Sequence, residues 1–440
     1  MSSAATVNVV TGAVREAAWP LAARAGDYDP LLERIGDASF VLIGEGTHGT
    51  EKFYMERAEI TRRLIVEKNF NAVAVESDWL DACPVNEYVR GEGDPKSDVE
   101  SLAGFRRFQA WMWRNYQMVN FASWMRSHND ALPGGQAKAG FYGLDLYGLH
   151  ASLEAVIRYL DNGDPDASRR ARDCCSCIER FGDHFSADTY TGGFGLTASR
   201  ENELVNQLVE RQRHASEHAR RDPREAADEF FFEEQNARLI LNAGAYYRSM
   251  LRGGIPWRNL HSRHIAETIE ALEERLKRQY GAAKIVVWQH NSLLGDARAT
   301  QRGRAGELSV GQLVRERYGD DSVLIGFFTY AGTVSAASTW DGAAERERVA
   351  PAIGGSYESL FHDVGLPRFL LVLRPGERAA LSLSEPRLER SISAIYRPES
   401  ERGAYFEATL SGQFDAILHF DETSAIVPLD RCRVAARGGS

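Results

Sequence analysis

The sequence predicts an α/β fold, in which a largely parallel or mixed sheet carries flanking helices and a large all-helical insertion. Short apolar runs of strand length recur along the chain, helical patterns separate most of them, and one long stretch lacks strand signals. The predicted strands are residues 40–43, 72–75, 140–144, 284–288, 323–329, 369–373 and 415–420.

The stretch without strand signals defines the expected domains. Helical patterns fill it, so we predict a first part of the α/β core, a helical insertion that forms a lid or substrate pocket, and a second part of the core. These are residues 1–148, 149–282 and 283–440. Aromatic residues of the insertion either line a pocket or, as is usual at helical spacing, form its core: Phe230, Phe231, Phe232, Tyr246 and Tyr247.

Composition excludes several classes of protein. Across 440 residues no apolar stretch approaches the roughly 20 residues that span a bilayer. The net charge of −10 argues against a nucleic-acid partner, which requires clustered lysines and arginines. The N-terminus lacks a cationic start followed by an apolar segment, so we expect no signal peptide and a cytoplasmic location. Of five cysteines, Cys174, Cys175 and Cys177 cluster without the second pair that a zinc site requires.

An acid and a histidine lie three residues apart in a glycine-rich turn. Glu45 and His48 follow the strand at residues 40–43 and precede a helical pattern that starts near Glu51. The carboxyl ends of strands are where open α/β sheets form binding crevices. We therefore expect both side chains at such a crevice.

The same turn matches the dinucleotide-binding pattern G-x-G-x-x-G through Gly44, Gly46 and Gly49, and Glu76 stands where a ribose-binding acid would be. Glu45 argues against this function, because it places a carboxylate where the backbone must approach a doubly charged pyrophosphate. The Gly-Lys-Ser/Thr of a P-loop is also missing. We therefore predict no nucleotide cofactor in this turn.

Three further predicted strands end in polar residues. Glu76, Asp145 and His290 follow the second, third and fourth strands, and a common sheet edge would bring them close to the acid and histidine of the turn. Each has a structural alternative: Glu76 accepting from loop amides, Asp145 capping a helix, and His290 capping a strand end. Arg57, on the helix after the turn, either reaches back to the crevice or faces water.

Two chemistries use this set of side chains, and sequence spacing does not separate them. In the first, His48 takes a proton from water while a carboxylate fixes its tautomer. We expect the dipole of the following helix to keep this imidazole neutral. In the second, Glu45, His48, Glu76 and His290 bind a divalent metal that activates water.

Several motifs resemble the erythromycin esterase family, and together they span most of the chain. They are residues 44–51 (Gly-Glu-Gly-Thr-His-Gly-Thr-Glu), Phe53, Arg57, 75–76, 143–145, 288–291, 295–296, 313–319 and 415–422. The resemblance implies an α/β core with a helical insertion that hydrolyses a cyclic or linear ester. It also implies that His48 activates water with Glu45, Glu76, Arg57 and His290 around it, and it leaves the metal question open.

The departures from the family pattern fall at the expected site. Leu293 stands where the family has a second histidine, so an apolar group replaces a proton carrier. In residues 259–265 an Arg and an Asp of the pattern are absent, whereas His264 is retained and His261 is new. We assign these three residues and Asp145 to substrate binding, and we expect an altered substrate or reaction.

The sequence therefore predicts an esterase-like hydrolase of antibiotic resistance or secondary metabolism, needing no cofactor, with a bulky and partly apolar small molecule as substrate. His48 would be the general base, Glu45 and Glu76 would tune it, and Arg57 with His290 would stabilise the oxyanion. One alternative is a non-hydrolytic acid/base enzyme (a cyclase, dehydratase or acyl transferase), because Leu293 makes the pocket drier. Another is a protein that sequesters its ligand without turnover.

Overall fold

The computed structural model describes residues 4–93, 96–106, 110–146, 231–232, 235–236, 238–239, 242, 246, 249, 255–339 and 342–429. The chain divides into two compact units. The larger comprises Met1–Ser77, Asp81–Gly143 and Leu276–Ser440, and the smaller Asp78–Leu80 and Leu144–Arg275. Most of the predicted insertion, including Cys174, Cys175 and Cys177, lies outside the described residues. The predicted boundaries of that insertion stay a prediction.

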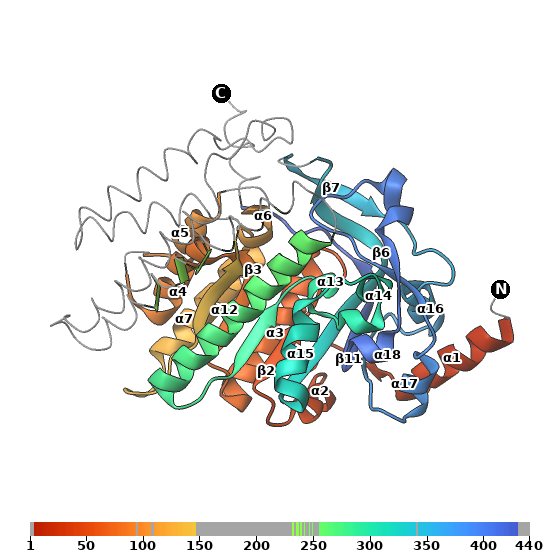
Figure 1. Ribbon diagram of the computed structural model, residues 1–440, viewed down its shortest axis with the longest axis horizontal. Helices are drawn as coiled ribbons and strands as arrows, with labels where there is room; N and C mark the ends of the chain where they lie inside the picture. Colours follow the sequence, from red (N-terminus) through yellow and green to blue (C-terminus); the bar gives the residue numbers. More distant parts are fainter. Residues whose placement is uncertain are drawn as a thin grey trace. The chain divides into compact units, whose positions relative to one another are not determined.

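A nine-stranded mixed sheet confirms the predicted fold class (Figure 1). Its strand order is β1-β8-β11-β6-β2-β5-β3-β4, and β7 pairs with β6. The central pairs β2–β5, β3–β5, β2–β6 and β6–β11 are parallel, whereas β1–β8, β8–β11 and β6–β7 are antiparallel. The strands are β1 (Trp19–Pro20), β2 (Phe40–Ile43), β3 (Ala72–Asp78), β4 (Gly140–Asp145), β5 (Ile285–Trp288), β6 (Ser322–Ala337), β7 (Ala344–Val349), β8 (Arg368–Val372) and β11 (Ala416–Thr423).

Every predicted strand is present, but four strands in the described part of the chain were not predicted. They are β1, β7 and the two members of a separate antiparallel hairpin, β9 (Arg387–Arg390) and β10 (Tyr405–Ala408). The sequence of β7 is Ala-Glu-Arg-Glu-Arg-Val, which has no apolar run because the strand is largely exposed. β6 is also longer than predicted, since its second half leaves β11 and continues beside β7.

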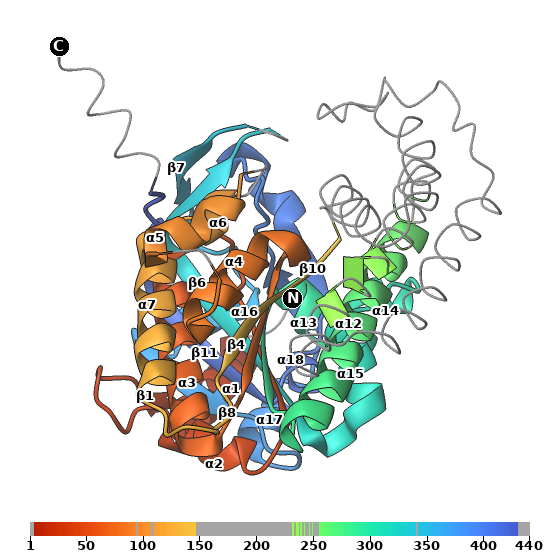
Figure 2. The same ribbon diagram turned by 90° about the vertical axis from the view of Figure 1, so that its left-hand side faces the viewer.

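Helices cover both faces of the sheet: Figure 2 shows α3 and α7 on one side and α13 and α15 on the other. The helices are α1 (Ala4–Ala17), α2 (Asp29–Ile35), α3 (Glu51–Lys68), α4 (Trp79–Arg90), α5 (Asp98–Ser101), α6 (Ala110–Trp113), α7 (Tyr116–Asp130), α12 (Pro256–Tyr280), α13 (Asn291–Leu294), α14 (Gln301–Arg304), α15 (Val310–Tyr318), α16 (Tyr357–Asp363), α17 (Arg378–Ser382) and α18 (Leu410–Gln413). Short 3-10 turns occupy Leu102–Gly104, Ala297–Ala299, Gly319–Asp321 and Pro398–Ala404. Among the described residues, no helix combines the length and apolar character needed to cross a bilayer.

The core beneath α3 fixes the start of the site. Phe53, Ile60 and Leu64 of α3 are buried in one cluster with Ile43 of β2 and Val75 of β3. α3 ends at Lys68, and the left-handed backbone of the next residue, Asn69, closes the helix and returns the chain to β3. Both strands therefore pack against the same helix, whose start follows the loop after β2.

In the smaller unit, the described aromatic residues of the insertion pack as core residues do. Phe231 is buried with its ring 5.7 Å from that of Trp79, and Tyr246 is buried with its ring 5.6 Å from that of Trp257. Phe232 contacts the same Trp79 ring. These contacts favour the core interpretation for the three residues; Phe230 and Tyr247 lie outside the described part of the chain.

Candidate active site

Glu45 and His48 form a buried pair in the loop between β2 and α3. The His48 Nδ1 lies 2.8 Å from the Glu45 Oε1, and both side chains are almost fully enclosed. The His48 Nε2 has no hydrogen-bond partner among the described residues. An ionised Glu45 accepts the Nδ1 proton, so the opposite nitrogen is left to take a proton from another molecule.

Glycine is required in this loop by close packing, which explains the pattern without a nucleotide. A Cβ at Gly44 would lie 2.0 Å from the Asn291 Oδ1, and one at Gly46 would lie 2.8 Å from the Phe327 carbonyl oxygen. Gly49 also has a φ of 66°, a backbone conformation that side chains disfavour. The loop therefore packs closely against β6 and the start of α13.

Arg57 is fully buried and forms an ion pair with Glu45. Its Nη2 is 3.1 Å from the Glu45 Oε2, and its guanidinium carbon lies 4.4 Å from the Tyr54 ring centroid and 5.1 Å from that of Trp288. The guanidinium is therefore placed to hold the Glu45 carboxylate in position. The oxyanion role that we expected for Arg57 stays a prediction.

His290 follows β5, and it contacts both Glu76 and His48. Its backbone N–H donates to the Glu76 Oε2 at 2.7 Å, and its ring centroid lies 4.7 Å from that of His48. The His290 Nδ1 accepts from the Ser292 N–H at 3.2 Å, so the side chain caps α13. A neutral His290 consequently carries its proton on Nε2, which is directed towards the Gly46 carbonyl without reaching hydrogen-bond geometry.

The two histidines differ in their pKa. Burial alone would lower the pKa of His48, but the hydrogen bond and charge of Glu45, with the charge of Glu76, outweigh it and raise that pKa. The dipole of the following helix, which we expected to keep this imidazole neutral, acts against these charges, and the net shift of the pKa is upward. Burial and the charge of His48 lower the pKa of His290 to about 3. Burial opposes the ionisation of Glu45, yet Arg57 and His48 hold its pKa below the usual value.

The four residues considered for a metal do not fit one. The Glu45 Oε1 accepts from the His48 imidazole, the Glu45 Oε2 is ion-paired with the Arg57 guanidinium, and the His290 Nδ1 already accepts from Ser292. Within the described ranges, no three His, Cys, Asp or Glu side chains are arranged to hold a metal ion. A metal needs several donors that are not already engaged, so we derive no metal-assisted step.

Asp145, His261 and His264 belong to the smaller unit. The His261 Nε2 lies 2.7 Å from the Asp145 Oδ1, and both side chains are buried, so Asp145 pairs with a histidine. The His264 Nδ1 is 3.0 Å from the Asn242 Nδ2, and burial lowers the pKa of His264 to about 3. Leu293 lies in α13 of the larger unit and is half-buried. Substrate binding by these four residues stays a prediction.

Sequence reasoning missed the residues that hold the site together. Asn291 is fully buried: its N–H donates to the Glu45 carbonyl at 2.8 Å, and its Nδ2 donates to the Phe327 carbonyl at 2.9 Å. Ser292 sets the tautomer of His290, and Tyr54 lies against Arg57. Asn291 and Ser292 directly follow His290 in the sequence, and Tyr54 lies one helical turn before Arg57. These positions were the signal that could have found them.

Comparison with known proteins decides the family. A family model described as erythromycin esterase matches residues 65–423. The chain belongs to the erythromycin esterase family. The matched range includes Glu76, His290 and Leu293, whereas Glu45 and His48 precede it.

Individual relatives of this family member are distant. An Escherichia coli protein named erythromycin esterase type II is 22% identical over 415 residues, which cover 90% of this chain and 93% of that protein. A solved structure titled succinoglycan biosynthesis protein is 23% identical, with a TM-score of 0.73 over 97% of this chain and 99% of that one. An erythromycin esterase mutant in its open conformation is 18% identical, with a TM-score of 0.64 over 90% and 94% of the two chains. At such identities the solved structures show the fold alone.

Proposed function

We propose that this family member hydrolyses an ester or lactone of a bulky, partly apolar small molecule by means of water that His48 activates. One observation carries the proposal: a buried carboxylate bonds one nitrogen of His48 at 2.8 Å and leaves the other without a partner among the described residues. This is the arrangement in which an imidazole acts as a general base. Family membership supports a hydrolase.

In the proposed reaction, the His48 Nε2 takes a proton from water while the water oxygen attacks the acyl carbon. The Nδ1 proton stays bonded to Glu45, whose charge stabilises the imidazolium. When the tetrahedral intermediate breaks down, the Nε2 proton passes to the leaving alkoxide, so one water is consumed and an acid and an alcohol are released. Arg57 keeps Glu45 ionised throughout.

His290 is the proposed oxyanion donor. Because burial keeps this imidazole neutral and its Nδ1 accepts from Ser292, the proton is on Nε2, which has no hydrogen-bond partner among the described residues. An N–H that is held in place by the capping contact of Nδ1 and has no strong acceptor of its own needs little reorganisation when negative charge develops on a nearby substrate oxygen. Glu76 holds the backbone of the same residue through its N–H.

Leu293 favours a second candidate function. The half-buried leucine stands one helical turn from His290, where the family pattern has a histidine, and it adds apolar surface without a proton carrier. Such a site favours acid/base chemistry that excludes water, such as cyclisation, dehydration or acyl transfer. Our first proposal keeps hydrolysis because the pair of Glu45 and His48 is intact.

Product mass distinguishes these functions. Incubation with macrolide lactones and aryl esters should give products heavier by one water or cleaved at the ester, at a rate that a metal chelator leaves unchanged. Loss of water or an isomer of equal mass would support the second function. Tight binding without any product, unaffected by the change His48→Ala, would instead indicate sequestration and contradict both enzyme proposals.

The change Glu76→Gln should shift the pH dependence of kcat/KM. The charge of Glu76 raises the pKa of His48, and the base is active only when neutral, so activity rises as the pH passes through that raised pKa. Removing the charge lowers this pKa, and the acid limb should move to lower pH. Glutamine retains a carbonyl oxygen for the His290 N–H, so the plateau should persist. An acid limb that stays in place or moves upward would contradict the assigned base.

A further inference from the structure

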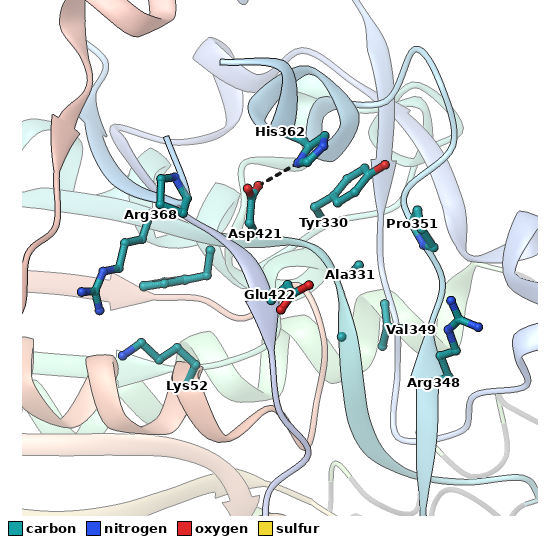
Figure 3. A pocket seen from close by; sticks show the side chains of 13 residues that line it. Lys52, Tyr330, Ala331, Arg348, Val349, Pro351, His362, Arg368, Asp421 and Glu422 are labelled. Atoms are coloured by element: carbon teal, nitrogen blue, oxygen red, sulfur yellow. Dashed lines mark hydrogen bonds and ion pairs between the residues drawn. The ribbon is translucent and has the colours of Figure 1, made fainter. Parts of the chain in front are cut away.

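A pocket with charged side chains in its walls lies in the larger unit, apart from the residues of the proposed active site. It is a half-open cavity of about 690 Å³ that none of Glu45, His48, Glu76 and His290 lines. Its walls come from five strands and helices of the sheet region: α3, β6, β7, β8 and β11, with α16 at one side (Figure 3). Cavities of this volume accommodate small-molecule ligands.

One wall of the pocket is a fixed aromatic platform. The rings of Tyr330 and His362 are stacked, with centroids 3.8 Å apart and planes within 4°. The His362 Nδ1 is 3.2 Å from the Asp421 Oδ1, which also lies 2.8 Å from the Nε2 of the fully buried His419. This chain of contacts orients the His362 ring. A preformed flat surface of this kind suits stacking of another ring.

Three cationic side chains line the pocket although the whole chain carries −10. Lys52, Arg348 and Arg368 line it, against the two carboxylates of Asp421 and Glu422. Lys52 also contacts the Glu56 carboxylate at 2.8 Å, whereas the guanidinium groups of Arg348 and Arg368 have no hydrogen bond or ion pair among the described residues. Figure 3 shows Lys52 and Arg368 with their charged ends on the same side of the pocket. Cations without partners on a concave surface favour an anionic ligand.

We propose that this pocket binds an anionic small molecule that carries a flat ring, the chemical class that a nucleoside monophosphate represents. The ring stacks on the platform of Tyr330 and His362, and the phosphate lies between Lys52 and Arg368. The exposed Glu422 carboxylate accepts hydroxyl groups of the sugar. The site is separate from ester hydrolysis and does not depend on it.

Calorimetric titration of the full chain with adenosine monophosphate tests the proposal. We expect saturable binding that is about fivefold or more tighter than that of ribose 5-phosphate, which lacks the ring. It should also be about tenfold or more tighter than that of adenosine, which lacks the charge. Inorganic phosphate should bind more weakly still. Absence of saturable binding at millimolar concentration, or equal affinity for all four probes, would overturn the proposal.

Matched variants assign the binding to this pocket. Arg368→Ala should weaken binding about tenfold, while Arg346→Ala, which removes an exposed arginine of β7 that does not line the pocket, should have no effect. Tyr330→Leu should abolish the preference for the ring-bearing ligand and Tyr330→Phe should retain it, with folding checked by circular dichroism. Loss of affinity in Arg346→Ala equal to that in Arg368→Ala would refute the site.

Discussion

Replacing His48 by alanine should lower turnover by about 10²- to 10⁴-fold while the fold is retained. The imidazole is the one group in the loop with both a carboxylate on one nitrogen and a second nitrogen without a partner among the described residues. His290 cannot replace it as the base. Burial lowers the pKa of His290 to about 3, so its imidazole binds a proton only weakly. The rate should be measured on whichever ester or lactone the wild-type chain cleaves.

Two controls give this experiment its meaning. His128→Ala removes a half-buried histidine of α7 outside the site and should leave the rate unchanged. Adding imidazole to His48→Ala should restore part of the rate, because the small base can enter the space that the side chain vacated. If His48→Ala keeps wild-type turnover, His48 is not the base and the proposed mechanism fails.

Replacing Arg57 by methionine should lower the free energy of unfolding by about 3–5 kcal/mol, because it leaves the buried carboxylate of Glu45 without its opposite charge. The charge of Arg57 is also the main influence that holds the pKa of Glu45 down against burial. Without it, Glu45 gains a proton more readily and no longer stabilises the His48 imidazolium. Activity should fall together with stability, as measured by urea unfolding and by kcat.

The double change Arg57→Met with Glu45→Gln separates the two effects. Removing both charges eliminates the uncompensated ion, so most of the stability should return, whereas the rate should stay low because His48 has lost its carboxylate. Arg62→Met serves as the matched control, since its partner Glu59 is about half exposed and such pairs contribute about 0–1 kcal/mol. A double variant as unstable as Arg57→Met alone would show that Arg57 does not act through Glu45.

The sequence predicted the parts of the fold that depend on local pattern. Apolar runs located all seven strands that it predicted, because buried central strands must be apolar along their whole length. The exposed, charged β7 has no such signal, and neither does the hairpin of β9 and β10. Their positions depend on pairing with distant segments, which residue patterns do not encode.

Sequence reasoning grouped Glu45, His48, Glu76 and His290 from their places at strand ends, and the structure brings the four together. It did not find the direction in which Arg57 points, because that depends on the rings of Tyr54 and Trp288. The pKa of His48 was misjudged for a related reason. A helix start can be read from local sequence, whereas the hydrogen bond between Glu45 and His48, which does most to raise this pKa, depends on how the loop folds, and the charge of Glu76 depends on tertiary structure.

The place of β5 in the sheet has a consequence for biosynthesis. β2 and β3 follow each other in the chain, yet they do not pair: β5, more than two hundred residues later, lies between them with parallel pairing on both sides. A ribosome therefore releases two apolar strands long before the strand that joins them exists. Until then the unpaired edges of β2 and β3 need protection from aggregation. His290 reaches its position beside His48 only when β5 pairs with these two strands.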